Sequence, residues 1–292
     1  MTNSTVNEKY NELFKRNQPI IDLKTQDKIK KLFVLVAGCG STGGAFIEGA
    51  SRLGILNFRL VEPDHFEMHN LNRQFVYPSD LGINKAEVHK RRLLALFNGL
   101  EPNIEIFSNG LNSQNVLELI CNVNIIFDAI DVTTHQGMQA KLTLHQEAAN
   151  KKIPVLSALD LGFKQWIRYY DYRINSDPLH GLMSEALKHQ HPLKSLIYGF
   201  CKLKELPVEI LIELKRLLET KNSSACQIAS SCHLLSSLTG PILIRFCQEK
   251  HIPNTVSLDL MREFETMEES IANLKLSKVL IQQIEKILTT ID

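Results

Sequence analysis

Residues 31–46, KLFVLVAGCGSTGGAF, decide the fold of this chain. An apolar, β-branched run at 32–37 stops at Gly38, and the GxGxxG loop of Gly38, Gly40 and Gly43 opens onto small and apolar residues at helical spacing. Such a run predicts a buried parallel strand followed by a helix. Glycines let backbone N–H groups approach phosphate oxygens at the positive end of a helix. The stretch therefore predicts a strand–loop–helix unit that binds a nucleotide.

Strand-like and helix-like segments alternate on both sides of this loop. The alternation predicts right-handed βαβ units and an α/β, Rossmann-like fold, with a mostly parallel sheet and helices on both of its faces. An aromatic, alternating run at 163–174 predicts an antiparallel extension of the sheet. The expected parallel strands lie at 32–37, 57–62, 104–107, 123–130 and 153–159, and the expected helices between them at 42–53, 81–100 and 134–152.

The chain divides into four predicted parts. Residues 1–30 form an N-terminal helical arm, with one or two short helices over 7–30, and residues 31–175 form a nucleotide-binding core. Residues 176–224 are a crossover or helical insertion, in which 207–220 is helix-like. Residues 225–292 complete the same fold, with a small-residue helix over 225–249, a strand over 254–261 and a terminal amphipathic helix over 264–291.

The composition is that of an ordinary globular protein. Its 33 Lys and Arg residues against 32 Asp and Glu residues leave a net charge of +1, and 44% of the residues are hydrophobic. These values exclude a disordered chain and disfavour a strongly basic nucleic-acid binder. No apolar run approaches the roughly 18 residues of a membrane span. The first residues are polar and contain no signal-peptide core, so we expect a cytoplasmic protein without a membrane segment.

The acid expected in such a nucleotide site is Glu62. It ends the second predicted strand, 24 residues after Gly38, where an acid can bind ribose hydroxyls. The loop and the acid alone fit any nucleotide, including the dinucleotide of an NAD-dependent oxidoreductase. A glycine-rich turn that only lets helix and strand pack closely would also fit the loop.

The residues downstream of Glu62 make a resemblance specific. A second acid follows it, then an Asn-Leu-x-Arg-Gln motif, a lysine on the next helix, and a strand whose terminal aspartate is followed three residues later by another. This order resembles the ThiF/MoeB/HesA family, the adenylating domain of ubiquitin-activating enzymes and their bacterial relatives. The resemblance covers about residues 10–175 and, weakly, 225–262. The matching residues are Glu62, Asp64, Asn70, Leu71, Arg73, Gln74, Lys85, Asp128 and Asp131.

The resemblance implies an ATP-dependent adenylyltransferase that converts a carboxylate into an acyl-adenylate and releases pyrophosphate. ATP and Mg²⁺ are the implied cofactors, and the implied partner is a small ubiquitin-like protein or a peptide with a C-terminal carboxylate. Adenylation joins two anions, so cations are expected at the site. Arg73 can fork onto phosphate oxygens, and Lys85 supplies a point charge. Surface solvation is the ordinary alternative for both side chains.

Site residues carry over one by one from the motif. Asp131 would hold Mg²⁺ at the carboxyl end of a central strand, although an aspartate there can also cap the following helix. Arg73, Lys85 and Asp131 are the expected catalytic residues. The expected nucleotide-binding residues are Gly38, Gly40, Gly43, Glu62, Asp64, Asn70, Arg73, Gln74 and Lys85.

Two further candidates depend on the resemblance alone. In the family, an arginine of the N-terminal arm reaches the phosphates of a second subunit, so Arg16 is a candidate trans arginine and a homodimer is expected. Cys201 lies near the position of a family thiol nucleophile, beside Lys202 and Lys204, which can lower a thiol pKa. A packing cysteine is the alternative. No CxxC pair is present, so no structural zinc is expected.

Other function classes stay open at this point. An NAD-dependent oxidoreductase would use the same glycine loop and Glu62, but it leaves Arg73, Lys85 and Asp131 unexplained. A non-catalytic adaptor of the ThiF fold would have no reason to keep those three residues. Some relatives cyclise threonylcarbamoyladenosine in tRNA, and the short basic cluster at 89–92 allows a tRNA partner without favouring one.

Overall fold

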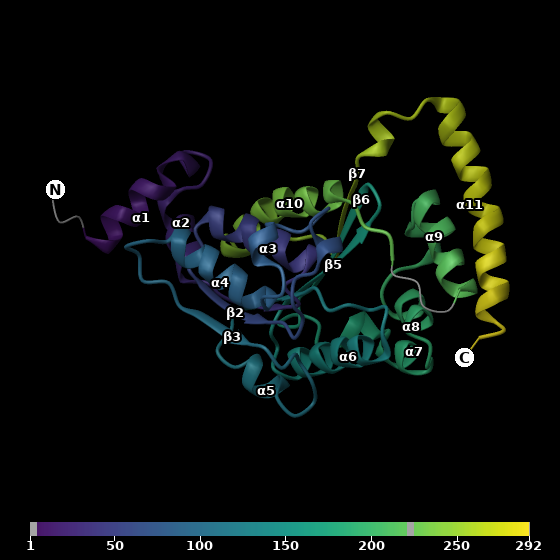
Figure 1. Cartoon of the computed structure of the whole chain (residues 1–292), viewed down its shortest axis with the longest axis horizontal. Helices are drawn as coiled ribbons and strands as arrows, with labels where there is room; N and C mark the ends of the chain where they lie inside the picture. Colours follow the sequence, from purple (N-terminus) through teal and green to yellow (C-terminus); the bar gives the residue numbers. More distant parts are fainter. Residues whose placement is uncertain (1–4, 221–224, 292) are drawn as a thin grey trace.

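A seven-stranded sheet forms the centre of the molecule (Figure 1). The computed structural model describes residues 5–220 and 225–291. The strand order is β3-β2-β1-β4-β5-β6-β7, in which β1 to β5 are parallel to one another, β6 is antiparallel to β5 and β7 is antiparallel to β6. The expected α/β fold with an antiparallel extension is confirmed. The strands are β1 Phe33–Ala37, β2 Asn57–Val61, β3 Ile104–Phe107, β4 Ile125–Asp128, β5 Val155–Leu161, β6 Lys164–Tyr170 and β7 Thr255–Asp259.

The strand register places the predicted motifs at one edge of this sheet. Ala37, the last residue of β1, pairs with Val61 at the end of β2 and with Asp128 at the end of β4. The loops after these three strands therefore start side by side. Carboxyl ends of parallel strands at the point where strand order reverses are where open α/β sheets bind ligands.

Helices cover both faces of the sheet, and Figure 1 shows the layers. One face packs Val34, Val36 and Phe58 against one group of helices, and the other packs Leu35 and Ile126 against a second. The first group is α1 Val6–Phe14, α2 Leu23–Lys31, α3 Ser41–Leu53, α4 Lys85–Leu96 and α10 Ala229–Cys247, and the second is α5 Val116–Leu119, α6 His135–Asn150 and α7 Met183–Leu187.

The N-terminal helices expected over 7–30 are present and contribute to the core. Tyr10 and Phe14 of α1 are buried in the main hydrophobic cluster. The Tyr10 hydroxyl donates a hydrogen bond of 2.9 Å to the Gly54 carbonyl. The segment therefore packs on the sheet instead of extending freely from it.

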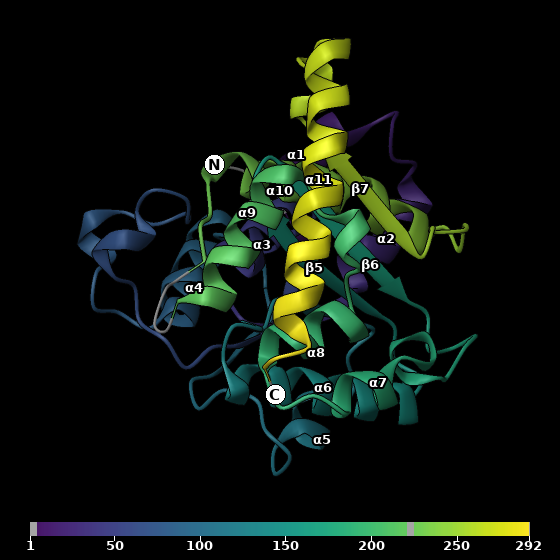
Figure 2. The ribbon, with the colours of Figure 1, turned by 90° about the vertical axis from the view of Figure 1, so that its right-hand side faces the viewer.

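Besides the hydrophobic clusters on the two faces of the sheet, a third, smaller hydrophobic cluster is formed by helices alone. It joins α8 Pro192–Gly199, α9 Val208–Glu219 and α11 Met267–Leu288 through buried leucine and isoleucine side chains. Figure 2 shows α11 running across α9 and α8, with its first turns projecting past them. The two short helices α7 and α8 fall in 176–224, where only 207–220 was expected to be helical. No helix in the described part of the chain combines the length and apolar composition that crossing a membrane needs.

Short 3₁₀ turns connect the main elements. They matter most between β2 and α4, where the helix expected from residue 81 starts instead at Lys85, because Asn84 caps it. Over residues 5–220 and 225–291 these turns are η1 Lys15–Asn17, η2 Met68–Asn70, η3 Pro78–Asp80, η4 Pro178–Gly181, η5 Leu203–Glu205 and η6 Met261–Glu263.

Candidate active site

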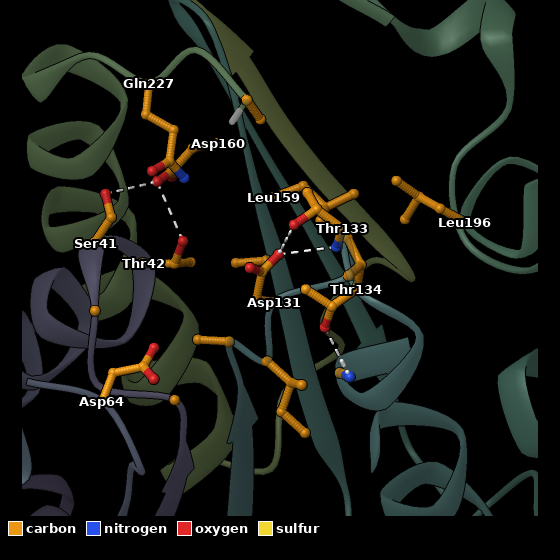
Figure 3. A pocket seen from close by; sticks show the side chains of 18 of the residues that line it. Ser41, Thr42, Asp64, Asp131, Thr133, Thr134, Leu159, Asp160, Leu196 and Gln227 are labelled. Carbon is orange, nitrogen blue, oxygen red and sulfur yellow. Dashed lines mark hydrogen bonds between the residues drawn. The ribbon is translucent and has the colours of Figure 1, made fainter. Parts of the chain in front are cut away.

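A cavity of about 740 Å³ opens at the carboxyl ends of the parallel strands (Figure 3). Its volume suits a ligand of the size of a nucleotide or larger. It gathers eight of the nine predicted nucleotide-binding residues, together with Asp131 and Cys201; Gly43 and Arg16 do not line it. The predicted residues on its wall are Gly38, Gly40, Glu62, Asp64, Asn70, Arg73, Gln74, Lys85, Asp131 and Cys201.

The three loop glycines serve two purposes. Gly38 has φ +91°, and a Cβ there would lie 2.5 Å from the Ala129 carbonyl oxygen. A Cβ on Gly43 would lie 1.8 Å from the Gly38 oxygen, so both positions need glycine for close packing. At Gly40 a Cβ would meet only the ends of Gln74 and Lys85, at 3.7 and 4.0 Å. The space above Gly40 is therefore where an anion can approach the loop.

The Glu62 carboxylate holds this loop in place. It is 4% exposed, and its two oxygens accept hydrogen bonds from the backbone N–H groups of Cys39 at 2.6 Å and Asp64 at 2.9 Å. Burial raises the pKa of Glu62, and the nearby Lys85 charge opposes that rise. The ribose role of Glu62 stays a prediction, since its oxygens already serve the backbone.

Lys85 reaches over the glycine loop from the start of α4. Asn84 fixes that start, because its side chain accepts from the Ala86 N–H at 3.0 Å and donates to the Glu62 carbonyl at 2.9 Å. The Lys85 stem is buried, and its Nζ lies 3.4 Å from Oδ2 of the exposed Asp64. The ammonium group thus sits at the cavity wall with one weak carboxylate partner.

Arg73 also lines the cavity and is held there by hydrogen bonds. Its Nε donates to Gln227 Oε1 at 2.6 Å, and its Nη1 donates to the His69 carbonyl at 2.9 Å. Burial lowers the pKa of this guanidinium. Asn70 is buried and accepts from the Glu67 N–H at 2.9 Å, which shapes the turn that carries Arg73. Gln227 was not expected at the site, and no motif marks it.

Gln74 offers an unused acceptor to the cavity. Its Oε1 is buried and has no hydrogen-bond partner among the residues that the structure describes. A buried polar atom without a partner is costly, and most such atoms are satisfied by a ligand or water. The carboxamide lies beside Gly40, so a hydroxyl or amino group of a bound nucleotide is within its reach.

Asp131 lies exposed in the loop after β4. Its Oδ1 accepts from both the N–H and the hydroxyl of Thr133, each at 2.8 Å (Figure 3). The alternative that Asp131 caps α6 is wrong, because Thr134 is the cap and accepts from the Gly137 N–H at 3.0 Å. The second carboxylate oxygen of Asp131 is thus available to a cation in the cavity.

Asp128, three residues earlier, has a different role. It is fully buried and accepts hydrogen bonds from Lys141, from His145 Nε2 at 3.0 Å and from Ser157 Oγ at 2.9 Å. Burial raises the pKa of this carboxyl, but the Lys141 and His145 partners outweigh burial and hold the pKa well below its usual range. Lys141 and His145 are four residues apart in the sequence, and this spacing puts both side chains on one buried face of α6.

A second unexpected carboxylate, Asp160, anchors the start of α3. Its Oδ2 accepts from the hydroxyls of Ser41 and Thr42, both at 3.1 Å, and Figure 3 shows both bonds. The Cys232 thiol contributes a longer contact of 3.6 Å. Burial raises the pKa of Asp160. Asp160 therefore connects β5 to the glycine loop.

The side chains of the cavity suit a Mg²⁺ ion that is bound partly by substrate phosphates and water. They do not provide a complete set of protein ligands for a metal. Among the described residues, no group of three His, Cys, Asp or Glu side chains is placed to hold a metal. Mg²⁺ commonly binds through one or two carboxylates plus substrate phosphates and water. Asp131, whose Oδ2 accepts no hydrogen bond from the residues that the structure describes, fits that requirement.

Cys201 is poorly suited to nucleophilic attack. It is 2% exposed and packs with Leu161 and Trp166. The expectation that Lys202 and Lys204 lower its pKa is wrong, since burial raises the pKa of the thiol to about 12. A reactive cysteine needs a thiolate and access to solvent. Arg16 is exposed on η1, outside the cavity of its own chain.

The fold and this cavity define a nucleotide-binding α/β protein of the Rossmann-like class. Within that class the chain belongs to the ThiF family, whose model matches residues 14–279. The expected family is confirmed, and the family links the chain to ATP-dependent adenylyltransferases.

Curated relatives match part of the chain. A probable molybdopterin-synthase adenylyltransferase of Porphyra purpurea is 32% identical over 114 residues, which are 39% of this chain and 29% of the relative. A sulfur carrier protein adenylyltransferase of Thermus thermophilus is 33% identical over 114 residues, which are 39% of this chain and 41% of the relative. The sulfur carrier protein ThiS adenylyltransferase of Bacillus subtilis is 28% identical over 144 residues, covering 47% of this chain and 40% of the relative. The chain thus spans well under half the length of these three relatives.

Solved structures share the fold at low identity. PaaA superposes with a TM-score of 0.63 at 20% identity, covering 89% of this chain and 82% of PaaA. E. coli TcdA, a tRNA N6-threonylcarbamoyladenosine dehydratase, superposes with a TM-score of 0.59 at 17% identity, covering 84% of this chain and 98% of TcdA. E. coli MccB with ATP superposes with a TM-score of 0.57 at 18% identity, covering 81% of this chain and 63% of MccB. These likenesses establish the ThiF fold for this chain.

Proposed function

We propose that this protein uses ATP and Mg²⁺ to adenylate the C-terminal carboxylate of a peptide or small protein. The observation that carries the proposal is the convergence of Gly40, Arg73, Lys85 and Asp131 on one cavity at the carboxyl ends of the strands. The activities of the relatives support it, because sulfur carrier proteins are activated by two of them. Family membership supports the use of ATP.

The chemistry requires charge stabilisation and not proton transfer. A carboxylate oxygen attacks the α-phosphorus of ATP, the bond from that phosphorus to the bridging oxygen breaks, and pyrophosphate leaves with the electron pair. The acyl-adenylate and pyrophosphate together carry the charge that the carboxylate and ATP brought. No general base is needed, which agrees with a site built from cations and backbone N–H groups.

Each site residue has a role in that step. Gly40 lets the α-phosphate approach the N-terminus of α3. Lys85 and Arg73 would both face the phosphates, and Arg73 would exchange its bond to Gln227 for a phosphate oxygen. Asp131 would hold Mg²⁺, which when bound neutralises charge on the departing pyrophosphate. Gln74 would accept a hydrogen bond from the ribose or the base.

The first test is exchange of labelled pyrophosphate into ATP in the presence of N-acetylated tetrapeptides with randomised last residues. We expect peptide-dependent exchange in the wild type and none above background in Asp131→Asn. Ser257→Ala, on the exposed edge strand β7, is the matched control and should behave as the wild type. Failure of the wild type to bind ATP in an equilibrium titration would contradict the proposal.

The proposal includes a homodimer in which Arg16 enters the cavity of the partner subunit. Arg16→Ala and Asp131→Asn chains would each be inactive alone. In a mixed dimer, the Asp131 of one chain and the Arg16 of the other complete one site, so mixing should restore about a quarter of the wild-type exchange. No recovery after mixing, with sedimentation showing mixed dimers, would exclude a trans arginine.

A further inference from the structure

The cavity has a second, apolar part that the nucleotide residues do not form. We call it the leucine arm; it is lined by side chains of α8, α9 and the segment before α9, opposite the end of β5. In Figure 3, Leu196 of α8 lies across the opening from Leu159 and Thr133. The residues that define the leucine arm are Leu159, Leu196, Ile197, Leu206, Ile210 and Leu217.

ATP would leave the leucine arm empty. With phosphates at Gly40 and the ribose near Glu62, which follows β2, the adenine would extend to the side of β2 and β3. Cavity residues on that side include Pro63 and Gly110. The strand order puts β5 and the leucine arm on the other side of β1 and β4. The arm therefore lies on the side from which the second substrate must reach the α-phosphate.

The charges around the leucine arm restrict what it can hold. The charged residue that α9 contributes to the cavity lining is Glu213, which is paired with Arg216 through bonds of 2.7 Å that lower the pKa of Glu213 to about 2. An ionised side chain entering the arm would lose water without gaining an opposite charge from the leucine and isoleucine side chains. An apolar side chain would instead bury its surface there.

We infer that the leucine arm binds the side chain of an apolar C-terminal residue, such as leucine or phenylalanine, on the carboxylate substrate. The inference rests on the proposed adenylation, because the arm adjoins the Asp131 loop where the carboxylate would react. It makes the arm the specificity-determining part of the site. A substrate ending in glycine would leave the arm unfilled.

The test compares N-acetylated pentapeptides that differ only in the last residue: Leu, Phe, Gly or Asp. Binding is measured by calorimetry with α,β-methylene ATP present, whose α–β bond cannot be cleaved, and turnover by pyrophosphate exchange. We expect the Leu and Phe peptides to bind and exchange at least about tenfold better than the Gly peptide, and the Asp peptide to be the poorest. Equal or better binding of the Gly peptide would overturn the inference.

Variants that fill the leucine arm separate it from the nucleotide site. Leu196→Trp and Ile210→Trp, on different helices, should each abolish the preference for Leu over Gly while leaving ATP affinity within about twofold. Leu196→Met, which conserves volume, should keep the preference. If ATP binds but the Leu peptide neither binds nor exchanges, the inference fails while ATP use stands. If ATP itself does not bind, the proposed function fails instead.

Discussion

The two parts of the cavity, its nucleotide end and its leucine arm, are built in different ways. The nucleotide end comes from loops that follow β1, β2 and β4. These loops are held by hydrogen bonds that the Glu62 and Asp160 carboxylates accept and that the Asn84 side chain donates. The leucine arm comes from α8 and α9, whose side chains pack with α11 in a separate cluster. Charge and backbone geometry define the first, whereas shape and apolar surface define the second.

This difference suggests a division of work between chemistry and selection. Phosphate chemistry needs fixed donors and cations, because small displacements of charge are costly. Choice among acyl substrates needs only a pocket of suitable shape and polarity, and helices outside the sheet can supply it. Substitutions at the nucleotide end should therefore affect all substrates alike, and substitutions in the leucine arm should affect some more than others.

Lys141→Met should give the largest effect, on stability, by leaving the buried Asp128 carboxylate beneath the nucleotide end without its cation. Breaking a buried pair in this way lowers the free energy of unfolding by about 3–5 kcal/mol. Urea denaturation monitored by circular dichroism measures the change. Asp131 is only three residues from Asp128 but is exposed, so Asp131→Asn should change the free energy of unfolding by about 0.5 kcal/mol or less. Equal losses would refute the separate roles of the two aspartates.

Lys85→Ala should lower pyrophosphate exchange by about 10²–10³-fold for every peptide, because it removes a cation facing the phosphates. Lys85→Arg keeps the charge and should retain more activity than Lys85→Ala. Parallel assays with the Leu and Gly peptides would show whether both decline by the same factor. A decline for only one peptide would mean that Lys85 takes part in substrate selection, against the division above.

His89→Gln should change how stability depends on pH. His89 packs beneath the glycine loop, with its Nε2 3.0 Å from the Cys39 carbonyl, and burial lowers its pKa to about 4 from 6.5. The unfolded chain therefore binds more protons than the folded chain between these pH values. The contribution of His89 to the free energy of unfolding is therefore complete above pH 6.5. It falls by about 3 kcal/mol in all as the pH decreases toward 4.

Urea titrations at several pH values would measure this loss in the wild type and in His89→Gln, whose amide can still donate to the carbonyl. The variant should lose less stability across the window than the wild type. Glu62, with a raised pKa, acts in the opposite direction in both proteins and cancels in the comparison. Identical pH profiles would show that His89 titrates normally.

Cys201→Ala should have the smallest effect on the first chemical step. The thiol lines the cavity but is buried, and burial raises its pKa to about 12. We expect exchange within about twofold of the wild type and little reaction of the folded protein with iodoacetamide at this position, as measured by mass spectrometry. The exposed Cys121 provides an internal control for labelling.

The nucleotide end could be predicted from sequence because its residues follow strands at short, regular distances. Gly38, Glu62 and Asp131 each come within three residues of a strand end, so the sheet itself brings them together. Lys85, which the resemblance supplied, lies in the cavity wall, although its helix starts four residues later than the sequence predicts.

The leucine arm could not be predicted, because its parts have no fixed distance from a strand. Leu196 and Ile210 lie on helices whose positions depend on tertiary packing with α11. The bond from Gln227 to Arg73 joins residues 154 positions apart, and the Asp160 contacts with Ser41 and Thr42 join residues more than 110 apart. Local patterns carry no signal for such pairs.

The most direct test of the central claim follows an oxygen atom. The pentapeptide ending in leucine, labelled with ¹⁸O in its carboxylate, is incubated with ATP and Mg²⁺, and hydroxylamine captures the activated acyl group. If the carboxylate attacks the α-phosphorus, the AMP released will carry one ¹⁸O atom, visible as a shifted ³¹P resonance. Unlabelled AMP, or ADP in place of AMP, would contradict adenylation at this site.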